Sequence, residues 1–488
     1  MDSTQILLQG LPISNEFRCD LGDERRTNRV KAVAESLAER PAESLPEVFD
    51  NPSDLEAVYR LLRNRSVGFK ELTEGHLHAT VERVDKVGRV CVLHDTTEFN
   101  WSHRDSLRWG LGKFSSRRQG FLAHVSLVVS ADGLRCPLGC SCVRPYVRPT
   151  DLASEDEREW WSERHPYWDS EFDRWIEGVK TAQETMGDVA QLIHIMDREG
   201  DAYELMHLLC SQKWSFVIRF GRLRCVYDPL RGEYSKLHRV LENSPFVAER
   251  TVVISERINA GRDPYQRKAF PSRKGREVRV SIRACKLEIC RPKKRSDLAT
   301  LSKRIPVNVV EVVELDPPNG EEPVHWLLVT TEPINTVEEM LQVVDLYRSR
   351  WVIEEFFKAI KTGCGYRKRQ LESAQTLLTA LAITLPIAWR LLALRHLERC
   401  AADEPVGSVV SDIQLEILRR CAKACSISET PTLGETLYAV ARLGGHLRSN
   451  GPPGWQVLGR GWMKLTLLEA GYRIAMKIQK EYTGLPNL

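Results

Sequence analysis

Two short apolar runs, each followed at once by an aspartate, constrain the fold of this chain more than any other feature. The first run is Val90–His94, followed by Asp95, and the second is Leu192–Met196, followed by Asp197. Runs of this length with β-branched residues predict buried β-strands. Open α/β sheets place their chemistry at strand ends, so both aspartates are candidate site residues. Either aspartate alone could instead be a helix N-cap.

A second feature is a set of four polar residues at regular spacing near residue 350. They are Tyr347, Arg350, Glu354 and Lys361. On one helix their spacing puts all four along one side, next to an apolar stripe that would face the core. The carboxylate can hold a divalent metal, and the two cations and the phenol can bind phosphate oxygens. An amphipathic helix with i,i+4 ion pairs is the alternative.

Glu354 and the two aspartates together make three carboxylates that can converge. Converging carboxylates repel one another unless cations lie between them. A set of ligands made only of oxygen atoms predicts Mg²⁺ or Mn²⁺ rather than zinc. The reaction that matches such a set is two-metal phosphoryl transfer.

These motifs, in this order, resemble those of the DDE transposases of the insertion sequence four family. The residues that carry the resemblance are Asp95-Thr96-Thr97, then Asp197-Arg198-Glu199, then the Tyr-x2-Arg-x3-Glu-x6-Lys pattern that ends at Lys361. The resemblance implies that Asp95, Asp197 and Glu354 form a catalytic triad. It also implies that these residues hold two Mg²⁺ ions, for which Mn²⁺ can substitute, on a ribonuclease H-like fold.

The predicted fold class is α/β in a multidomain α+β arrangement, with a mixed sheet, a β-strand insertion and helical domains at both ends. We predict three domains. They are a helical DNA-end-binding domain at 1–75, a ribonuclease H-like catalytic domain at 76–370 and a helical dimerisation domain at 371–488. Glu354 follows Asp197 too late for a single connection, which predicts the insertion at about 222–335. That insertion is β-like and basic.

Two N-terminal segments carry arginines at helical spacing. Asp20 is predicted to cap the first helix, and the second runs near Leu55–Arg65. The arginines are Arg25, Arg26 and Arg29 in the first segment, and Arg60 and Arg63 in the second. A solvated surface is the alternative for both. The first segment resembles the end-binding region of the family, which implies contact with DNA phosphates first and base edges second.

Two further DNA contacts are implied by the resemblance. Trp326 lies in the predicted strand His325–Thr330, where a tryptophan is usually part of the core. The corresponding position in the family stacks on a base flipped out near the cleavage site. Arg219 resembles a family position that contacts DNA in the active site. With Tyr347, Arg350 and Lys361, these residues complete the predicted DNA contacts.

Composition narrows the class of protein. A chain of 488 residues with 28% charged and 42% hydrophobic residues is typical of a soluble globular protein with several domains. The net charge is only +4, so affinity for DNA must come from local patches. No signal peptide is expected, and the apolar stretch Leu377–Trp389 is too short to span a membrane. The 13 cysteines are irregularly spaced, which predicts reduced thiols. We therefore expect a cytoplasmic bacterial protein, associated with the nucleoid when bound to DNA and with no membrane partner.

The predicted function is cut-and-paste DNA transposition by metal-dependent hydrolysis and strand transfer, with a hairpin intermediate. The predicted partners are double-stranded DNA, both transposon ends and target, and a second copy of the chain in a synaptic homodimer. One alternative is a metal-dependent DNA nuclease of the same fold that does not join strands. The other is a catalytically silent regulator that binds the ends of the element.

Overall fold

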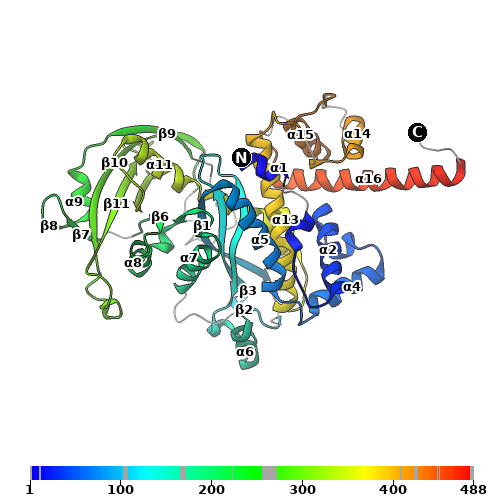
Figure 1. Cartoon of the computed structure of the whole chain (residues 1–488), viewed down its shortest axis with the longest axis horizontal. Helices are drawn as coiled ribbons and strands as arrows, with labels where there is room; N and C mark the ends of the chain where they lie inside the picture. The colour runs from blue at the N-terminus through cyan, green and yellow to red at the C-terminus, as the bar shows by residue number, and fades with distance from the viewer. Residues whose placement is uncertain are drawn as a thin grey trace. The chain divides into compact units, whose positions relative to one another are not determined.

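The computed structural model describes residues 3–9, 13–102, 108–164, 172–221, 224–254, 256, 272–406, 409–421, 427–447, 449 and 451–483. The chain divides into two compact units. The first unit combines Met1–Gln191 with Trp351–Leu488, and the second is Leu192–Arg350. Both units contain strands and helices (Figure 1), which confirms the predicted α/β class. The three domains predicted from the sequence stay a prediction.

The described strands of the first unit form an antiparallel sheet. They are β1 (Arg89–Ser102), β2 (Gly112–Ser115), β3 (Arg118–Ser130) and β4 (Pro137–Tyr146). β1 pairs with one edge of β3, and β2 and β4 share the other edge. The dipeptide Asp132-Gly133 predicts a hairpin turn, and the β3–β4 turn there has Gly133 at φ 88°, a conformation that glycine adopts without strain.

The helices of the first unit come from both ends of the chain (Figure 1). The N-terminal ones are α1 (Ser3–Gln9), η1 (Ile13–Phe17), α2 (Glu24–Glu39), α3 (Leu45–Val48), α4 (Pro52–Arg63) and α5 (Phe69–Val87). After the sheet come η2 (Pro149–Asp151), α6 (Glu155–Arg164) and α7 (Asp173–Met186). The C-terminal part has α12 (Trp351–Lys358), the π-helix η5 (Ala359–Gly363), η6 (Tyr366–Lys368), α13 (Ala374–Cys400), α14 (Asp412–Cys421), α15 (Leu433–Leu443) and α16 (Trp455–Thr483).

α13 is the central helix of this unit. Ser373 caps it by accepting a hydrogen bond from the Thr376 N–H, and the helix packs against α5, β4 and α15. Among the described helices it is the one that is long and apolar enough to cross a membrane, yet it is almost wholly buried inside the protein. The sequence placed its apolar stretch at Leu377–Trp389, so the full helix is longer than that stretch.

A buried ionic group ties the N-terminal segment to this core. Glu16 in η1 accepts hydrogen bonds from Arg83 at 2.7 Å and from Nδ1 of His76, both on α5. The Arg83 guanidinium also donates to the Leu138 carbonyl in β4 and lies 4.0 Å from the ring centre of Trp389 in α13. Because a buried charge that loses its partner costs about 3–5 kcal/mol, this group makes η1 part of the core of the unit.

The second unit is built on a long mixed sheet. Its strands are β5 (Gln191–Met196), β6 (Ser215–Arg219), β7 (Cys225–Asp228), β8 (Glu233–Lys236), β9 (Ala248–Ile254), β10 (Arg276–Cys290), β11 (Arg304–Val313) and β12 (His325–Thr330). Their order is β5-β6-β12-β11-β10-β7-β8, and β9 also pairs with β10. β5 and β6 are parallel, and the other pairs are antiparallel.

Short helices complete the second unit. They are η3 (Arg198–Gly200), α8 (Tyr203–Ser211), α9 (Leu237–Glu242), η4 (Ser296–Leu298) and α11 (Val337–Arg348). Strands β9 to β12 fall where the sequence predicted an inserted sheet, because alternating β-branched residues there have a buried side. Part of the predicted basic stretch, 257–271, lies outside the described residues.

Candidate active site

Asp95 lies in the middle of β1, opposite Val125 of β3, and its side chain is largely buried. The sequence predicted that the strand ends at Asp95, and this is wrong. The strand continues to Ser102 because Thr96, Thr97 and the aromatic residues after them are also strand formers. One Asp95 carboxylate oxygen accepts a hydrogen bond from the Thr96 N–H at 2.7 Å.

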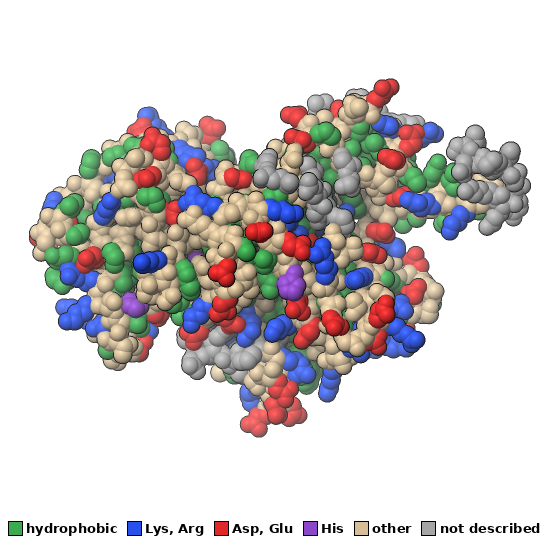
Figure 2. Space-filling view, in the orientation of Figure 1, with side chains coloured by type: hydrophobic (Ala, Val, Ile, Leu, Met, Phe, Trp, Pro, Cys, Tyr) green, Lys and Arg blue, Asp and Glu red, His purple; other side chains and the backbone are tan. Residues whose placement is uncertain are grey.

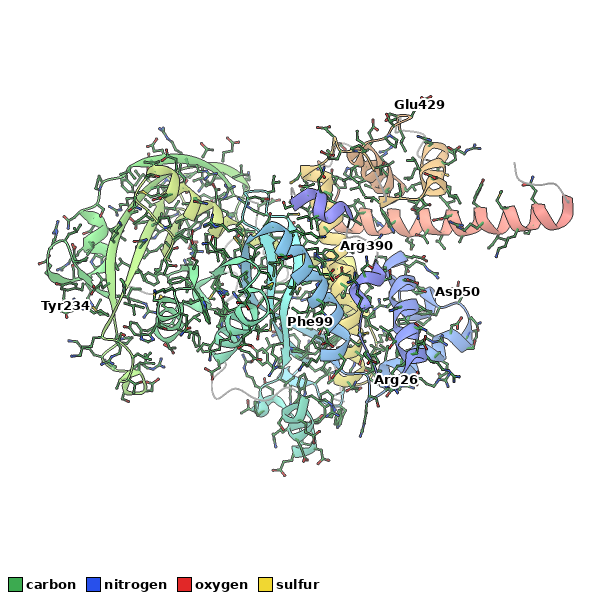
Figure 3. All side chains as sticks on the ribbon, viewed as in Figure 1. Arg26, Asp50, Phe99, Tyr234, Arg390 and Glu429 are labelled. Atoms are coloured by element: carbon green, nitrogen blue, oxygen red, sulfur yellow. The ribbon has the colours of Figure 1, made fainter. Side chains whose placement is uncertain are left out.

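Glu354 and Lys361 face the same strand from the C-terminal part of the first unit. Glu354 lies in α12, which packs against β1, and Lys361 lies in the π-helix that follows. The Lys361 ammonium donates a hydrogen bond to the Thr97 hydroxyl and lies 5.5 Å from the ring centre of Phe99, which Figure 3 labels on β1. Asp95, Thr97 and Phe99 alternate along β1, so they share the face that meets this lysine.

The electrostatics of Lys361 connect it to both predicted carboxylates of the first unit. Burial, together with the nearby Arg367, lowers the pKa of Lys361 to about 8. Glu354, Glu98 and Asp95 act in the opposite direction, because negative charges favour the ammonium form. The first unit therefore brings Asp95, Glu354 and Lys361 into one electrostatic group, and their catalytic role stays a prediction.

Asp197 follows β5 directly in the second unit, as predicted. Its side chain accepts a hydrogen bond from the Glu199 N–H at 2.8 Å and thereby caps the short helix η3. Asp197 is therefore a helix N-cap, which was the alternative role considered for it from the sequence. This cap fixes the carboxylate at the end of the strand, and its second oxygen keeps further acceptor positions.

The loop after Asp197 is held in place by Asp201. The Asp201 carboxylate accepts hydrogen bonds from the Gly221 N–H at 2.9 Å and from Nε of Arg224 at 3.1 Å. Its side chain is almost completely buried. We call Asp201, Gly221 and Arg224 the Asp201 clamp. It joins the loop after β5 to the loop after β6, so the position of Asp197 depends on both strands.

Arg219 and Tyr347 form a polar contact in the same unit. Arg219, at the end of β6, hydrogen-bonds to the Tyr347 hydroxyl, and its guanidinium also donates to the His325 carbonyl at 3.0 Å. Burial lowers the pKa of Arg219, and the charges of Arg198 and Arg350 act in the same direction. Guanidinium groups that act on one another in this way, one of them bonded to a phenol, suit the binding of phosphate oxygens.

Trp326 adds an aromatic face to this group. It is half-buried on β12, and its ring lies edge-on to that of Tyr347, with ring centres 5.7 Å apart. A tryptophan that is only half-buried is not a simple core residue. Arg219, Trp326 and Arg350 are therefore linked in the second unit through Tyr347 and Arg219, and their role in DNA contact stays a prediction.

The four-residue motif does not lie on one helix, and this prediction is wrong. α11 ends at Arg348, Ser349 and Arg350 form a turn, and α12 begins at Trp351. Tyr347 and Arg350 therefore belong to the second unit, while Glu354 and Lys361 belong to the first. The turn is stabilised locally, because the Arg350 N–H donates to the Tyr347 carbonyl at 3.1 Å.

The predicted DNA-binding arginines of α2 differ in their surroundings. Arg25 is exposed, whereas Arg26 (labelled in Figure 3) donates to the Leu21 carbonyl at 2.8 Å. Arg29 lies 3.7 Å from Asp54 of α4. The cap of α2 is Asp23, which accepts from the N–H groups of residues 25 and 26, so the prediction of Asp20 as the cap is wrong.

The predicted arginines of α4 are both exposed. Arg63 lies 3.6 Å from Glu372, and its guanidinium carbon is 5.8 Å from the ring centre of Tyr59. Arg60 has its side chain in solvent. Basic and acidic side chains are intermixed over α2 and α4 (Figure 2). The two helices pack against each other, so their arginines lie on neighbouring surfaces of the first unit.

Sequence reasoning missed two partners in the candidate site. Thr97 binds the Lys361 ammonium, and Arg198 acts electrostatically on Arg219. Both stand within two residues of a predicted aspartate, in the segments that carry the family resemblance. Their position beside the acids was the signal that could have identified them.

The described residues include no group of three His, Cys, Asp or Glu side chains that could hold a metal ion. Asp95 and Glu354 belong to the first unit and Asp197 to the second. In the first unit, Glu354 and Asp95 favour the ammonium form of Lys361, whose hydrogen bond goes to the Thr97 hydroxyl. Carboxylate oxygens are the ligands that Mg²⁺ and Mn²⁺ prefer, so the donor chemistry of the three residues fits a divalent ion.

Two family models match the chain. The model described as "Transposase DNA-binding" matches residues 13–67, which contain all five predicted arginines of α2 and α4. The model described as "Transposase DDE domain" matches residues 179–387. The second match contains Asp197 and Glu354, and Asp95 precedes it.

Proposed function

The chain belongs to the DDE transposases, and from that premise we propose that it carries out cut-and-paste transposition with Asp95, Asp197 and Glu354 as its catalytic carboxylates. DNA is its partner, because a transposase DNA-binding segment accompanies the DDE domain. The observation that carries the proposal is the electrostatic group of Asp95, Glu354 and Lys361 in the first unit. An acidic pair that keeps a cation beside it is suited to metal-dependent phosphoryl transfer.

The three carboxylates are the proposed ligands of two divalent ions, Mg²⁺ or Mn²⁺. When bound, such ions would activate the attacking oxygen and stabilise the leaving oxygen. The second unit supplies the complementary chemistry. Arg219, Arg350 and Tyr347 offer N–H and O–H donors to the phosphates on either side of the scissile bond. Lys361 places one more positive charge next to the acids.

The proposed reaction is a series of in-line displacements at phosphorus. Water first attacks the phosphodiester at the transposon end, the P–O3′ bond breaks, and a 3′-hydroxyl is released. That hydroxyl then attacks the opposite strand, which closes a hairpin and releases the flanking DNA. A second water reopens the hairpin, and the new 3′-hydroxyl attacks the target strand. Each step exchanges one P–O bond for another, so one site can serve all of them.

Single substitutions of the three carboxylates test the assignment. Asp95→Ala, Asp197→Ala and Glu354→Ala should each abolish cleavage of end DNA in Mg²⁺ while leaving end binding largely intact. The matched control is Glu355→Ala, because Glu355 is the next carboxylate on α12 and pairs instead with Arg395 and Arg399. Substantial cleavage by any of the three variants, or equal loss in the control, would contradict the assignment.

Strand transfer separates the transposase from the two rival functions. The purified chain, given pre-cleaved ends and a target plasmid, should join the ends to the plasmid. A nuclease of the same fold would cut ends but leave the plasmid unjoined. A silent regulator would bind ends and produce neither product.

We also propose a homodimer in the synaptic complex, with α16 as the contact. Exposed apolar side chains follow this helix, and Figure 2 shows hydrophobic side chains among basic ones on its coloured part. They are Leu467, Leu468, Tyr472, Ile474 and Ile478. Leu467, Ile474 and Ile478 recur at a spacing that suits packing against a second helix. We place the protein in the bacterial cytoplasm, on the nucleoid, where reduced thiols such as those of the described cysteines persist.

A further inference from the structure

Two cysteines face each other across neighbouring strands of the second unit. Cys225 is the first residue of β7, and Cys290 is the last residue of β10. The strands are antiparallel, with Val226 opposite Ile289. The next pair in this register is Cys225 with Cys290, and their thiols lie within hydrogen-bonding reach of each other. Cys225 is exposed and Cys290 is half-buried.

Cations flank this thiol pair on both sides. Lys236 of β8 lies opposite Cys225, and Arg304 of β11 lies opposite Cys290. The four residues thus form one row across β8, β7, β10 and β11. Positive charge beside a thiol favours the reactive thiolate form. The exposed Cys225 is accessible to a small oxidant, and Cys290 lies beside it as the second thiol of a disulfide.

We propose that Cys225 and Cys290 are a redox site that forms a reversible cross-strand disulfide with a small-molecule disulfide, such as oxidised glutathione, as the oxidant. Directly opposite residues of an antiparallel pair have Cα atoms about 4.5–5.5 Å apart. This range lies within the roughly 4.4–6.8 Å that disulfides span. The backbone can therefore accept the bond without moving the strands apart.

The reaction proceeds by two thiol–disulfide exchanges. Burial, together with the adjacent Cys225 thiol, raises the pKa of Cys290 to about 11, and Arg304 opposes this. The exposed Cys225 therefore attacks first: its sulfur bonds to one sulfur of the oxidised glutathione, and the other leaves as a thiolate. Cys290 then loses its proton to solvent and attacks the Cys225 sulfur, which releases the second glutathione. Two protein thiols are oxidised and one glutathione disulfide is reduced.

The disulfide would act on the Asp201 clamp. Arg224 immediately precedes Cys225 and donates to Asp201, which also holds the Gly221 N–H. A covalent bond at Cys225 fixes the strand that continues from this clamp. The expected physical consequence is slower opening of the segment 224–228, which hydrogen exchange reports directly. This inference does not depend on the proposed reaction.

Other thiols offer a matched comparison. Cys210 is a half-buried cysteine of α8, and its sulfur lies 3.8 Å from the Pro306 carbonyl oxygen. Cys400 and Cys421 are exposed cysteines of the first unit. If exposure alone decided oxidation, these two would react as readily as Cys225.

The experiment uses the full chain in mixtures of oxidised and reduced glutathione, followed by peptide mass spectrometry without reduction. The wild type should yield one cross-linked peptide pair containing Cys225 and Cys290, with a mass two hydrogens below the sum of the free peptides. Cys225→Ser and Cys290→Ser should abolish this pair, while Cys210→Ser should retain it. Dithiothreitol should reverse the link. Hydrogen exchange of 224–228 should be slower in the oxidised wild type than in either serine variant.

Three outcomes would overturn the proposal. The first is that Cys225 and Cys290 stay free while Cys400 or Cys421 reacts. The second is that Cys225 links to Cys210 or remains a stable mixed disulfide with glutathione. The third is that the disulfide forms but exchange of 224–228 is unchanged, which would remove its effect on the Asp201 clamp. Melting temperatures of the serine variants close to that of the reduced wild type confirm that the comparison is between folded chains.

Discussion

Trp326 is the residue at which a substitution best distinguishes a structural role from a role in catalysis. Its ring is half-buried and lies edge-on to that of Tyr347, whose hydroxyl hydrogen-bonds to Arg219. An indole that stacks on an unpaired base has no part in the first hydrolysis, when the duplex is still paired. Trp326→Ala should therefore let nicked DNA accumulate and deplete the hairpin, with a loss of about 1–3 kcal/mol of stabilisation at that step.

Two controls sharpen this prediction. Trp326→Phe keeps an aromatic face and should recover part of the hairpin product. An abasic site at the flipped position should relieve part of the defect of the alanine variant, because no base has to be unstacked. A lowered melting temperature with equal loss at every step would instead show that Trp326 is only a packing residue.

Buried histidines predict that the fold weakens in mild acid. Burial lowers the pKa of His194, in β5, to about 3, and the same cause lowers that of His124, in β3, to about 3. The unfolded side chain binds a proton near pH 6.5, so the unfolded state is favoured as pH falls from 6.5 towards 3. In urea unfolding, the wild type should lose free energy of unfolding between pH 7 and pH 5. In His194→Leu this loss should be smaller than in the wild type by roughly 1–2 kcal/mol. His78→Leu, at an exposed position, should leave that difference unchanged.

Single residues could be predicted from the sequence where a motif fixed them, and not where the fold supplied their partners. The spacing of the motif identified Glu354 and Lys361, and the strand pattern identified Asp95. Neither indicated that the Thr97 hydroxyl would bind the Lys361 ammonium, because the two residues are more than 200 positions apart. Contacts of that kind depend on which faces of β1 and the π-helix meet.

At the level of elements, α2 predicts that its arginines contribute unequally to DNA binding. Arg25 is exposed, while Arg26 holds the Leu21 carbonyl at the start of the helix. Arg25→Ala should reduce the slope of log affinity against log salt by about 1, as expected for one lost phosphate contact. Arg26→Ala should lower the melting temperature of the protein, and it should change the salt slope less than Arg25→Ala does.

Fluorescence anisotropy with end DNA at several salt concentrations measures the salt slope of Arg25→Ala and that of Arg26→Ala. Lys477→Ala, at an exposed position on α16, is the control and should leave the slope unchanged. Equal slopes for wild type and Arg25→Ala, with only the cleavage rate reduced, would show that α2 serves another purpose.

Helices and strands with a clear hydrophobic period could be predicted from the sequence. A break in a helix that no glycine or proline marks could not. The hairpin at Asp132-Gly133 and the strands of the insertion follow from turn residues and alternation. The break between α11 and α12 has no glycine or proline at Ser349 or Arg350, and helical spacing continues through it. Tertiary packing determines the position of this break, because α11 and α12 belong to different compact units.

At the scale of the whole molecule, the exposed side of α16 predicts the assembly. Ile474 and Ile478 are 58% and 50% exposed, which is unusual for two large apolar residues one turn apart. The double variant Ile474→Glu, Ile478→Glu should bind single ends but fail to pair them, since charge on this side opposes packing of a second copy. Light scattering of the chain with end DNA should show one chain per complex, and Lys477→Ala should still pair ends. Paired complexes that persist in the double variant would place the dimer contact elsewhere.

Contacts between distant segments of the chain could not be predicted from the sequence order. The sequence predicted an N-terminal, a central and a C-terminal domain, and these stay a prediction. The first compact unit joins segments from both ends of the chain, partly through the contact of Arg83 with Glu16 and Trp389. A pattern read along the chain detects local periodicity, whereas such a unit is defined by contacts between distant segments.

The π-helix at Ala359–Gly363 has a consequence for how this chain can evolve. A π-turn holds one residue more than an α-turn, so the spacing between Glu354 and Lys361 includes that extra residue. A deletion that restored a regular helix would rotate Lys361 by about 100° around the helix axis, away from Thr97. Substitutions along this segment can accumulate while the contact survives, but a change of length would remove it. The number of residues between the glutamate and the lysine should therefore drift far less among descendants of this gene than the identity of those residues.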